Sequence, residues 1–155
     1  MTLQTSHSVP NRNWSYPTAI KFGVGRIAEL ADLGYTDAWS AETDGTDAFT
    51  PLVLTSQWAP SLRLGTAIVP VFTRGPAVIA QSALAMAQAA PGRFVLGLGT
   101  SSDVIVGRWN GIAFDEPYKR LRDTVRFVRT ALTGEKITHE YDSFSIRGFR
   151  LTAVP

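Results

Sequence analysis

The sequence predicts an α/β fold built around a parallel sheet, and three neighbouring features of its central stretch support that prediction. Residues 62–71, LRLGTAIVPV, form an apolar run rich in β-branched side chains, which is typical of a strand buried on both faces. Residues 76–90 keep a helical spacing of apolar side chains, beginning at Pro76 and ending before Pro91 and Gly92. Residues 94–98, FVLGL, are a second apolar run without alternation. A strand, a helix and a further strand in this order imply parallel pairing, because a parallel connection needs a crossover.

The N-terminal part predicts a loop followed by one helix. Residues 1–16 are polar and indicate a loop, with residues 2–6 as a candidate short strand. Ser15 as N-cap and Pro17 in the first turn predict a helix that ends at Gly34. Gly23 and Gly25 lower the helix propensity by about 0.5–1 kcal/mol each, so this helix would depend on packing.

The next segments repeat the order of strand and helix. Residues 36–41 predict a strand, and residues 42–47, ETDGTD, predict a polar turn. Asp47 is a candidate N-cap for a helix that reaches about Ala59. Counting these repeats along the chain gives about four βα units with parallel strands.

The C-terminal third predicts a long loop, one helix and a β-hairpin. The loop at residues 101–116 holds apolar side chains and is expected to be packed and partly helical. The helix begins at Pro117 and ends at Gly134, with a predicted buried stripe of Tyr118, Leu121, Val125, Val128 and Leu132. Its basic face, with Lys119, Arg120, Arg122, Arg126 and Arg129, is expected to be solvated. Residues 136–149 alternate around Asp142 and Ser143, which indicates a hairpin outside the main sheet.

Composition limits the class of protein. At 155 residues, with 45% apolar and 18% charged side chains, the chain is expected to be one globular domain over residues 1–155, shorter than the roughly 250 residues of a complete eight-unit barrel. The net charge of +2 without a basic run argues against a nucleic-acid partner. The absence of cysteine and the two distant histidines exclude disulfides and a local metal motif. No apolar run reaches the roughly 18 residues of a membrane span, so a cytoplasmic protein is expected.

Small and hydroxyl side chains follow the strand predicted at residues 94–98. Gly97 and Gly99 precede Thr100, Ser101 and Ser102. Ligands of parallel sheets bind at the carboxyl ends of the strands, where small residues let a phosphate or a flavin ring approach the backbone. The alternative is a tight strand exit without a ligand, because G-x-G alone is a weak signal.

Acidic side chains follow the strand predicted at residues 36–41. Glu42, Thr43, Asp44 and Asp47 offer carboxylates for hydrogen bonding or proton transfer at its carboxyl end. The alternative role is helix capping, which is favoured for Asp47 and left open for Glu42 and Thr43.

Two further patterns favour structural interpretations. Gly23, Gly25 and Ala28 spell G-x-G-x-x-A, with Glu42 beyond, but the expected helix before Gly23 does not fit a dinucleotide-binding fingerprint, which needs a strand there. Trp14, Trp39 and Trp58 are expected in the core, and Trp109, in the long loop, is the candidate exception.

Several blocks in a fixed order then point to a family. AWSAETDGTDAFTPL, LRLGTAIVPVFTRGPAVIAQSALAMAQAAPGRFVLGLGTSS, WNGIAFDEPYKRLRDTVRFVRTALTGEK and FSIRGFRL resemble the luciferase-like monooxygenase superfamily, especially its coenzyme F420-dependent (deazaflavin) oxidoreductases. The resemblance covers about residues 27–151. It implies the N-terminal half of a (β/α)8 TIM barrel, and transfer of hydride between coenzyme F420, or FMN as the alternative, and a small organic substrate.

The resemblance also implies site residues. Ala67 and Ile68 match a bulge that carries the family's non-proline cis peptide and backs the cofactor ring. Glu42 and Thr43 match catalytic positions that often hold an acidic residue and a histidine, and the histidine is absent here. The cofactor-binding set is completed by Gly99, Thr100, Ser101 and Ser102. Ser102 stands where some sugar-phosphate dehydrogenases of the branch have a catalytic glutamate.

Length is the main departure from the family, whose chains continue through a second half of the barrel. A half barrel leaves strand edges open. We therefore expect a homo-oligomer that completes itself, or a missing C-terminal half supplied otherwise. The alternative to an enzyme is a truncated, non-catalytic half-barrel or assembly module that binds another subunit.

Overall fold

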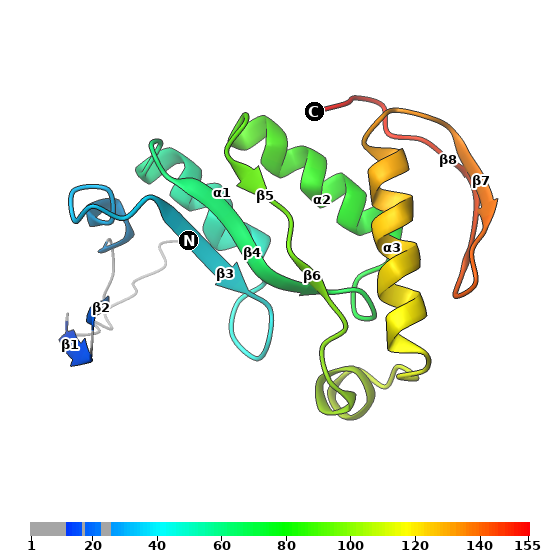
Figure 1. Cartoon of the computed structure of the whole chain (residues 1–155), viewed down its shortest axis with the longest axis horizontal. Helices are drawn as coiled ribbons and strands as arrows, with labels where there is room; N and C mark the ends of the chain where they lie inside the picture. Colours follow the sequence, from blue (N-terminus) through cyan, green and yellow to red (C-terminus); the bar gives the residue numbers. More distant parts are fainter. Residues whose placement is uncertain (1–11, 17, 23–25) are drawn as a thin grey trace, which may run out of the picture.

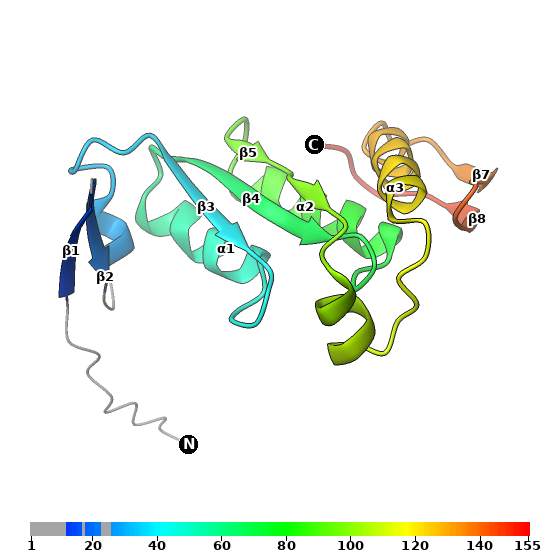
Figure 2. The same cartoon turned by 60° about the horizontal axis from the view of Figure 1, so that its bottom comes forward.

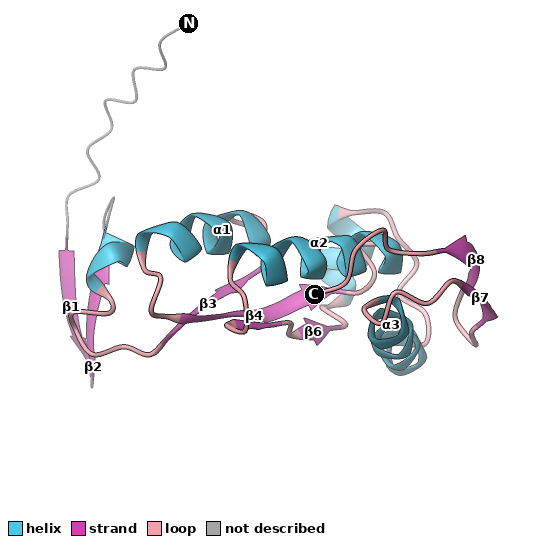
Figure 3. Cartoon of the chain, turned by 90° about the horizontal axis from the view of Figure 1, so that it is seen from above, coloured by secondary structure: helices cyan, strands magenta, loops and turns pink. Residues whose placement is uncertain are grey.

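The computed structural model describes residues 12–16, 18–22 and 26–155, and its largest sheet is parallel. This sheet contains β3 (Asp37–Ala41), β4 (Arg63–Pro70), β5 (Phe94–Val95) and β6 (Leu98–Gly99), with β4 pairing to each of the others (Figure 1). The crossovers are α1 (Phe49–Trp58) and α2 (Pro76–Ala89), and both lie on the same face of the sheet (Figure 3). The predicted α/β class and the central strand–helix–strand unit are thereby confirmed.

The third βα unit of the described chain is followed by a β-hairpin. After β6 come a π-helical segment, η2 (Val104–Trp109), and the helix α3 (Pro117–Ala131). The predicted hairpin is formed by β7 (Ile137–Glu140) and β8 (Ser145–Phe149), which pair antiparallel and lie beside α3 outside the main sheet (Figures 1 and 2).

The predicted N-terminal helix is wrong. In its place β1 (Arg12–Tyr16) and β2 (Thr18–Phe22) form an antiparallel pair, followed by a four-residue 3-10 helix, η1 (Arg26–Glu29). Tertiary pairing outweighed a weak helical period that two glycines had already reduced. β2 therefore places a strand, not the expected helix, directly before the G-x-G-x-x-A pattern, but this strand pairs antiparallel with β1 and is not part of the parallel βαβ unit that a dinucleotide-binding fingerprint needs. The candidate strand at residues 2–6 and the two glycines lie outside the described residues.

Gly97 divides the strand that was predicted as continuous. The hydroxyl of Thr66 accepts a hydrogen bond from Gly97 N–H at 2.8 Å and donates one to Gly97 C=O at 2.9 Å. A Cβ atom at residue 97 would lie 2.0 Å from the Thr66 carbonyl oxygen. Glycine is therefore required where residue 97 passes the Thr66 backbone. β5 pairs with β4 before Gly97, and β6 pairs with β4 after it.

The core lies between the sheet and its helices, while the opposite sheet face is exposed. Leu64, Val69 and Ile79 are fully buried between these layers. On the other face the Trp39 ring lies directly over Gly65 and is 50% exposed. The prediction that tryptophans lie in the core is wrong for Trp39 and for Trp58, which is 53% exposed. Trp109, the candidate exception, is also exposed. The side chain of Trp14 lies outside the described residues.

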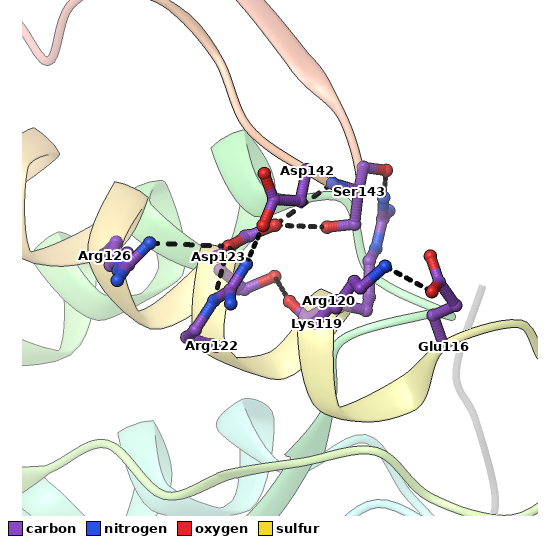
Figure 4. A network of polar contacts seen from close by, with 9 residues as sticks. Glu116, Lys119, Arg120, Arg122, Asp123, Arg126, Asp142 and Ser143 are labelled. Atoms are coloured by element: carbon purple, nitrogen blue, oxygen red, sulfur yellow. Dashed lines mark hydrogen bonds and ion pairs between the residues drawn. The ribbon is translucent and has the colours of Figure 1, made fainter.

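A buried carboxylate joins α3 to the hairpin turn. Asp123 is 1% exposed and accepts hydrogen bonds from Ser143 N–H and Oγ, each at 3.0 Å, and from Arg122 (Figure 4). Arg122 also pairs with Asp142 in the same turn. The buried face of α3 includes Asp123 and Phe127, which the predicted stripe did not contain. Tyr118, which the stripe did contain, is 74% exposed. The hairpin adds a second packing partner to α3, which a single-stripe prediction could not include.

Candidate functional site

A β-bulge lies at the carboxyl end of β4. Ser40 pairs with Thr66 and Ala41 pairs with Ile68, so Ala67 is an extra residue between two register positions. Ala67 is exposed and Ile68 is partly exposed. The bulge expected at Ala67 and Ile68 is therefore present. The described residues contain no cis peptide bond, so the cis peptide expected at this bulge is absent. Bulges of this kind redirect side chains next to functional sites.

Gly99 lies next to Ile68 of the bulge and has no side chain. A Cβ atom at residue 99 would lie 3.0 Å from Cγ2 of Ile68, so the Ile68 side chain rests against the Gly99 backbone. Gly99 pairs with Pro70, and its carbonyl accepts a hydrogen bond from Val71 N–H at 3.0 Å. Ile68 and Gly99 are thus in contact on neighbouring strands, and Ala67 lies next to them in the chain at the bulge.

Glu42 reaches the same end of the sheet from β3, but its carboxylate is fully engaged. Its backbone N–H donates to Ile68 C=O at 3.4 Å, beside the bulge. Arg74 donates from Nε to Oε1 at 2.9 Å and from Nη2 to Oε2 at 2.8 Å, and Ala48 N–H donates to Oε2 at 3.1 Å. The hydrogen bond that Arg74 donates to Glu42 raises the pKa of Arg74. Charge-assisted contacts of this number hold a carboxylate in place as an acceptor.

The other acidic-turn residues divide between capping and exposure. Asp47 accepts hydrogen bonds from Phe49 N–H at 2.9 Å and Thr50 N–H at 3.0 Å, so its predicted role as a helix cap is confirmed. Burial raises the pKa of the Asp47 carboxyl, but hydrogen bonds from Thr50 and Phe49 outweigh it and the net pKa is lowered. Thr43 is exposed, and its hydroxyl donates to Asp44 at 3.0 Å.

The loop after β6 extends the site. Thr100 and Ser101 are partly exposed, and Ser101 has a φ of 65°, an uncommon conformation for a residue with a side chain. Ser102 Oγ accepts a hydrogen bond from Ile105 N–H at 3.4 Å, at the start of η2. Strained, exposed backbone at a strand end is typical of ligand-binding loops.

The structure therefore brings most of the predicted residues to one end of the sheet. Glu42, Ala67, Ile68 and Gly99 are joined by contacts between neighbouring strands. Thr100, Ser101 and Ser102 continue directly from Gly99, whereas the Thr43 side chain is turned toward Asp44. The sequence analysis missed Arg74, although a lone arginine four residues beyond a buried strand and beside an acidic turn could have indicated an ion pair.

Other site classes find little support in the described residues. In that part of the chain, no three His, Cys, Asp or Glu side chains come together in a way that could hold a metal ion. Likewise, none of its helices has the length and apolar character needed to cross a bilayer.

The comparison that decides the family covers the whole chain. The family model for luciferase-like monooxygenases matches residues 1–155. The chain belongs to the luciferase-like monooxygenase family. Its match to the F420-dependent glucose-6-phosphate dehydrogenase 2 of Rhodococcus jostii is 31% identical and covers 89% of this chain and 46% of that protein.

Solved structures show the same fold. The coenzyme F420-dependent tetrahydromethanopterin reductase of Methanopyrus kandleri superposes with a TM-score of 0.72 at 20% identity, covering 83% of this chain and 42% of that one. The oxygenating constituent of 3,6-diketocamphane monooxygenase from Pseudomonas putida, solved with FMN, gives 0.66 at 16% identity, covering 81% and 37%. This luciferase-like chain thus spans less than half the length of the relatives it matches, and its fold is part of their barrel.

Proposed function

We propose that this luciferase-like chain contributes the strand-end part of a cofactor site in an F420-dependent oxidoreductase, with FMN as the alternative cofactor. The exposed bulge at Ala67 is the observation that supports the proposal most directly, because it occurs at the carboxyl end of a parallel strand within a family match over the whole chain. Named relatives depend on F420 or are solved with FMN. The substrate would be a small organic molecule.

The residues at the bulge fit a planar ring. Ala67 and Gly99 have minimal side chains, and Ile68 supplies an apolar surface between them. When bound, a deazaflavin or flavin supplies the hydride-transfer chemistry that side chains lack. Ala67 and Ile68 would support one face of the ring, and Thr100, Ser101 and Ser102 would offer hydroxyl and backbone groups beside it.

Glu42 is better suited to positioning than to proton transfer. Its two oxygens accept bonds from Arg74 and from Ala48 N–H, so the loops after β3 and β4 are held at fixed separation beside the bulge. The catalytic role expected for Glu42 and Thr43 stays a prediction. In this proposal the main contribution of the chain is to orient the cofactor and the substrate.

Completion of the site needs a second partner surface. Trp39 and Val95, on the sheet face without helices, are 50% and 39% exposed, a costly arrangement for large apolar side chains. We propose that a further half-barrel covers this face, supplied by a second copy of the chain or by additional polypeptide. The same exposure favours the second candidate function, an assembly module that binds another subunit without turnover.

Equilibrium binding of F420 and of FMN, followed by cofactor fluorescence, tests the proposal when oligomeric mass is measured on the same sample. Binding in the micromolar range is expected, and Ile68→Asp should weaken it at least about tenfold, because a charge would be placed against an apolar ring surface. Val53→Asp is the matched control: Val53 is 40% exposed on α1 and belongs neither to the bulge nor to the loop after β6, so its replacement should leave binding unchanged.

The same sample separates the two candidate functions. Comparison of the tryptophan emission of the wild type with that of Trp39→Phe isolates the signal of Trp39 on the open face. Burial of Trp39 in an oligomer would shift this signal to shorter wavelength. A cofactor-binding oligomer supports the oxidoreductase. An oligomer that buries Trp39 but binds neither cofactor at millimolar concentration supports the assembly module and contradicts the cofactor proposal.

A further inference from the structure

A polar groove lies between the C-terminal half of α3 and the start of the hairpin, apart from the strand ends. Its volume is about 340 Å³. The side chains that line it include Arg126, Thr130, Lys136, Thr138, His139 and Tyr141. α3 begins at Pro117, after the loop that follows η2, whereas the groove is lined by Arg126 and Thr130 in the C-terminal half of the same helix.

The groove carries positive charge that the described residues do not neutralise. Lys136 forms no ion pair within the part of the chain that the structure describes. Arg126 has Nη1 4.0 Å from Asp123 Oδ1 and is otherwise exposed (Figure 4). That Asp123 oxygen already accepts two hydrogen bonds from Arg122, so it can offset Arg126 only weakly.

Neutral donors and a firm wall accompany the two cations. Thr138 Oγ1 accepts a hydrogen bond from Gly148 N–H at 2.9 Å, which leaves its hydroxyl proton free to be donated. The Tyr141 ring packs edge-on against His139 at 4.4 Å and against Phe127 at 6.4 Å, which restricts its movement. Burial raises the pKa of the Tyr141 phenol, with Asp123 adding to the effect, so this group stays protonated.

We infer that this groove binds the phosphate group of a small phosphorylated molecule. Two cations from separate elements, α3 and the hairpin, face one cavity together with a free hydroxyl donor, and a phosphate monoester accepts charge-assisted hydrogen bonds from such a set. The inference is independent of the cofactor proposal, because no residue of the bulge or of the loop after β6 lines the groove.

The test follows the backbone amide signals of residues 136–141 by NMR during titration with glycerol 3-phosphate and, separately, with inorganic phosphate. Ionic strength is kept constant with chloride, because screening alone alters diffuse attraction. Saturable shifts are expected with glycerol 3-phosphate. Arg126→Gln and Lys136→Gln should each weaken binding at least about fivefold, since each removes one charge-assisted contact.

Arg129→Gln is the matched control, because Arg129 is exposed on the same helix, forms no described ion pair and does not line the groove. It should change affinity less than about twofold. Tighter binding of glycerol 3-phosphate than of inorganic phosphate supports a phosphorylated metabolite as the occupant. Equal weakening by all three variants, equal affinity for both probes, or shifts that do not saturate would overturn the inference.

Discussion

Arg74 binds Glu42 across two loops of the sheet, with Arg74 Nη2 2.8 Å from Glu42 Oε2 and Arg74 Nε 2.9 Å from Oε1. The loops follow the neighbouring parallel strands β3 and β4. The Arg74 guanidinium also lies 5.1 Å from the Phe49 ring centre, at the start of α1. One ion pair therefore fixes both loops and a helix N-terminus beside the bulge.

A double-mutant cycle of Glu42→Gln and Arg74→Gln should give a coupling of about 1–2 kcal/mol in the free energy of unfolding, measured with urea. The coupling is expected because the two side chains are only 18% and 22% exposed. The Asp37–Arg63 pair, with Arg63 59% exposed, is the control and should couple more weakly. Equal couplings for the two pairs would contradict this role of the Glu42–Arg74 ion pair.

Asp123→Asn should lower the free energy of unfolding by about 2 kcal/mol. Asp123 accepts hydrogen bonds from Ser143 N–H, from Ser143 Oγ and from Arg122. The amide NH2 group of asparagine would place a donor against these donors, and one of the bonds would be lost. Asp142→Asn, at a carboxylate that binds the same arginine but is 63% exposed, should cost clearly less. A thermal or urea denaturation series on both variants gives the comparison.

Acid should remove the stabilisation that Asp123 provides. Burial raises the pKa of this carboxyl, but hydrogen bonds from Arg122 and Ser143 outweigh it and the net pKa is lowered. Its contribution is therefore complete above the unfolded-state pKa of about 3.9 and is lost as the pH falls through the lower folded-state pKa. Urea unfolding between pH 7 and about pH 2 should show a steeper acid loss below about pH 4 for the wild type than for Asp123→Asn. Parallel profiles would exclude this role.

Asp47→Ala should cost about 1 kcal/mol in unfolding free energy, because it removes the acceptor for Phe49 N–H and Thr50 N–H at the start of α1. Asp44→Ala, in the same exposed turn but without such a capping contact, should be nearly neutral. If both substitutions cost the same, Asp47 does not act as the cap.

Three glycine-to-alanine changes should form a graded series in urea stability. Gly97→Ala should cost about 4 kcal/mol or prevent folding, because its Cβ would lie 2.0 Å from the Thr66 carbonyl oxygen. Gly99→Ala should cost less, since the contact is 3.0 Å to a side-chain atom of Ile68 and that side chain can shift. Gly75→Ala meets nothing within 4 Å at an ordinary φ of −66°, but Gly75 is the N-cap of α2, where alanine is less favourable than glycine, so the smallest cost of the three, about 0.5 kcal/mol, is expected. The reverse order would exclude close strand packing as the cause.

The sequence predicted the elements whose local signals agree with their tertiary surroundings. The apolar run of β4, the start of α2 at Pro76 and the hairpin around Asp142 and Ser143 all appear as expected. The N-terminal segment failed because its helical period was weak, and strand pairing between β1 and β2 decided its structure. A single sequence contains no direct record of such pairing.

The site divides in the same way. Order along the chain and the rule that ligands bind at the carboxyl ends of parallel strands were enough to select Glu42 and the segment from Gly99 to Ser102. Ala67 and Ile68 were selected only through the family resemblance. The engagement of Glu42 by Arg74 was not predicted, because the two residues are 32 positions apart and meet only when β3 pairs with β4.

By itself the sequence determined the parallel sheet, the family resemblance and the strand ends at which function is expected, because these depend on residue types and their spacing. Only the tertiary structure decided that Asp123 is buried, that Trp39 is exposed over Gly65 and that Arg126 and Lys136 share a groove. Each of these depends on which surfaces meet: the hairpin covers one side of α3, and no described helix covers the face of the sheet that carries Trp39.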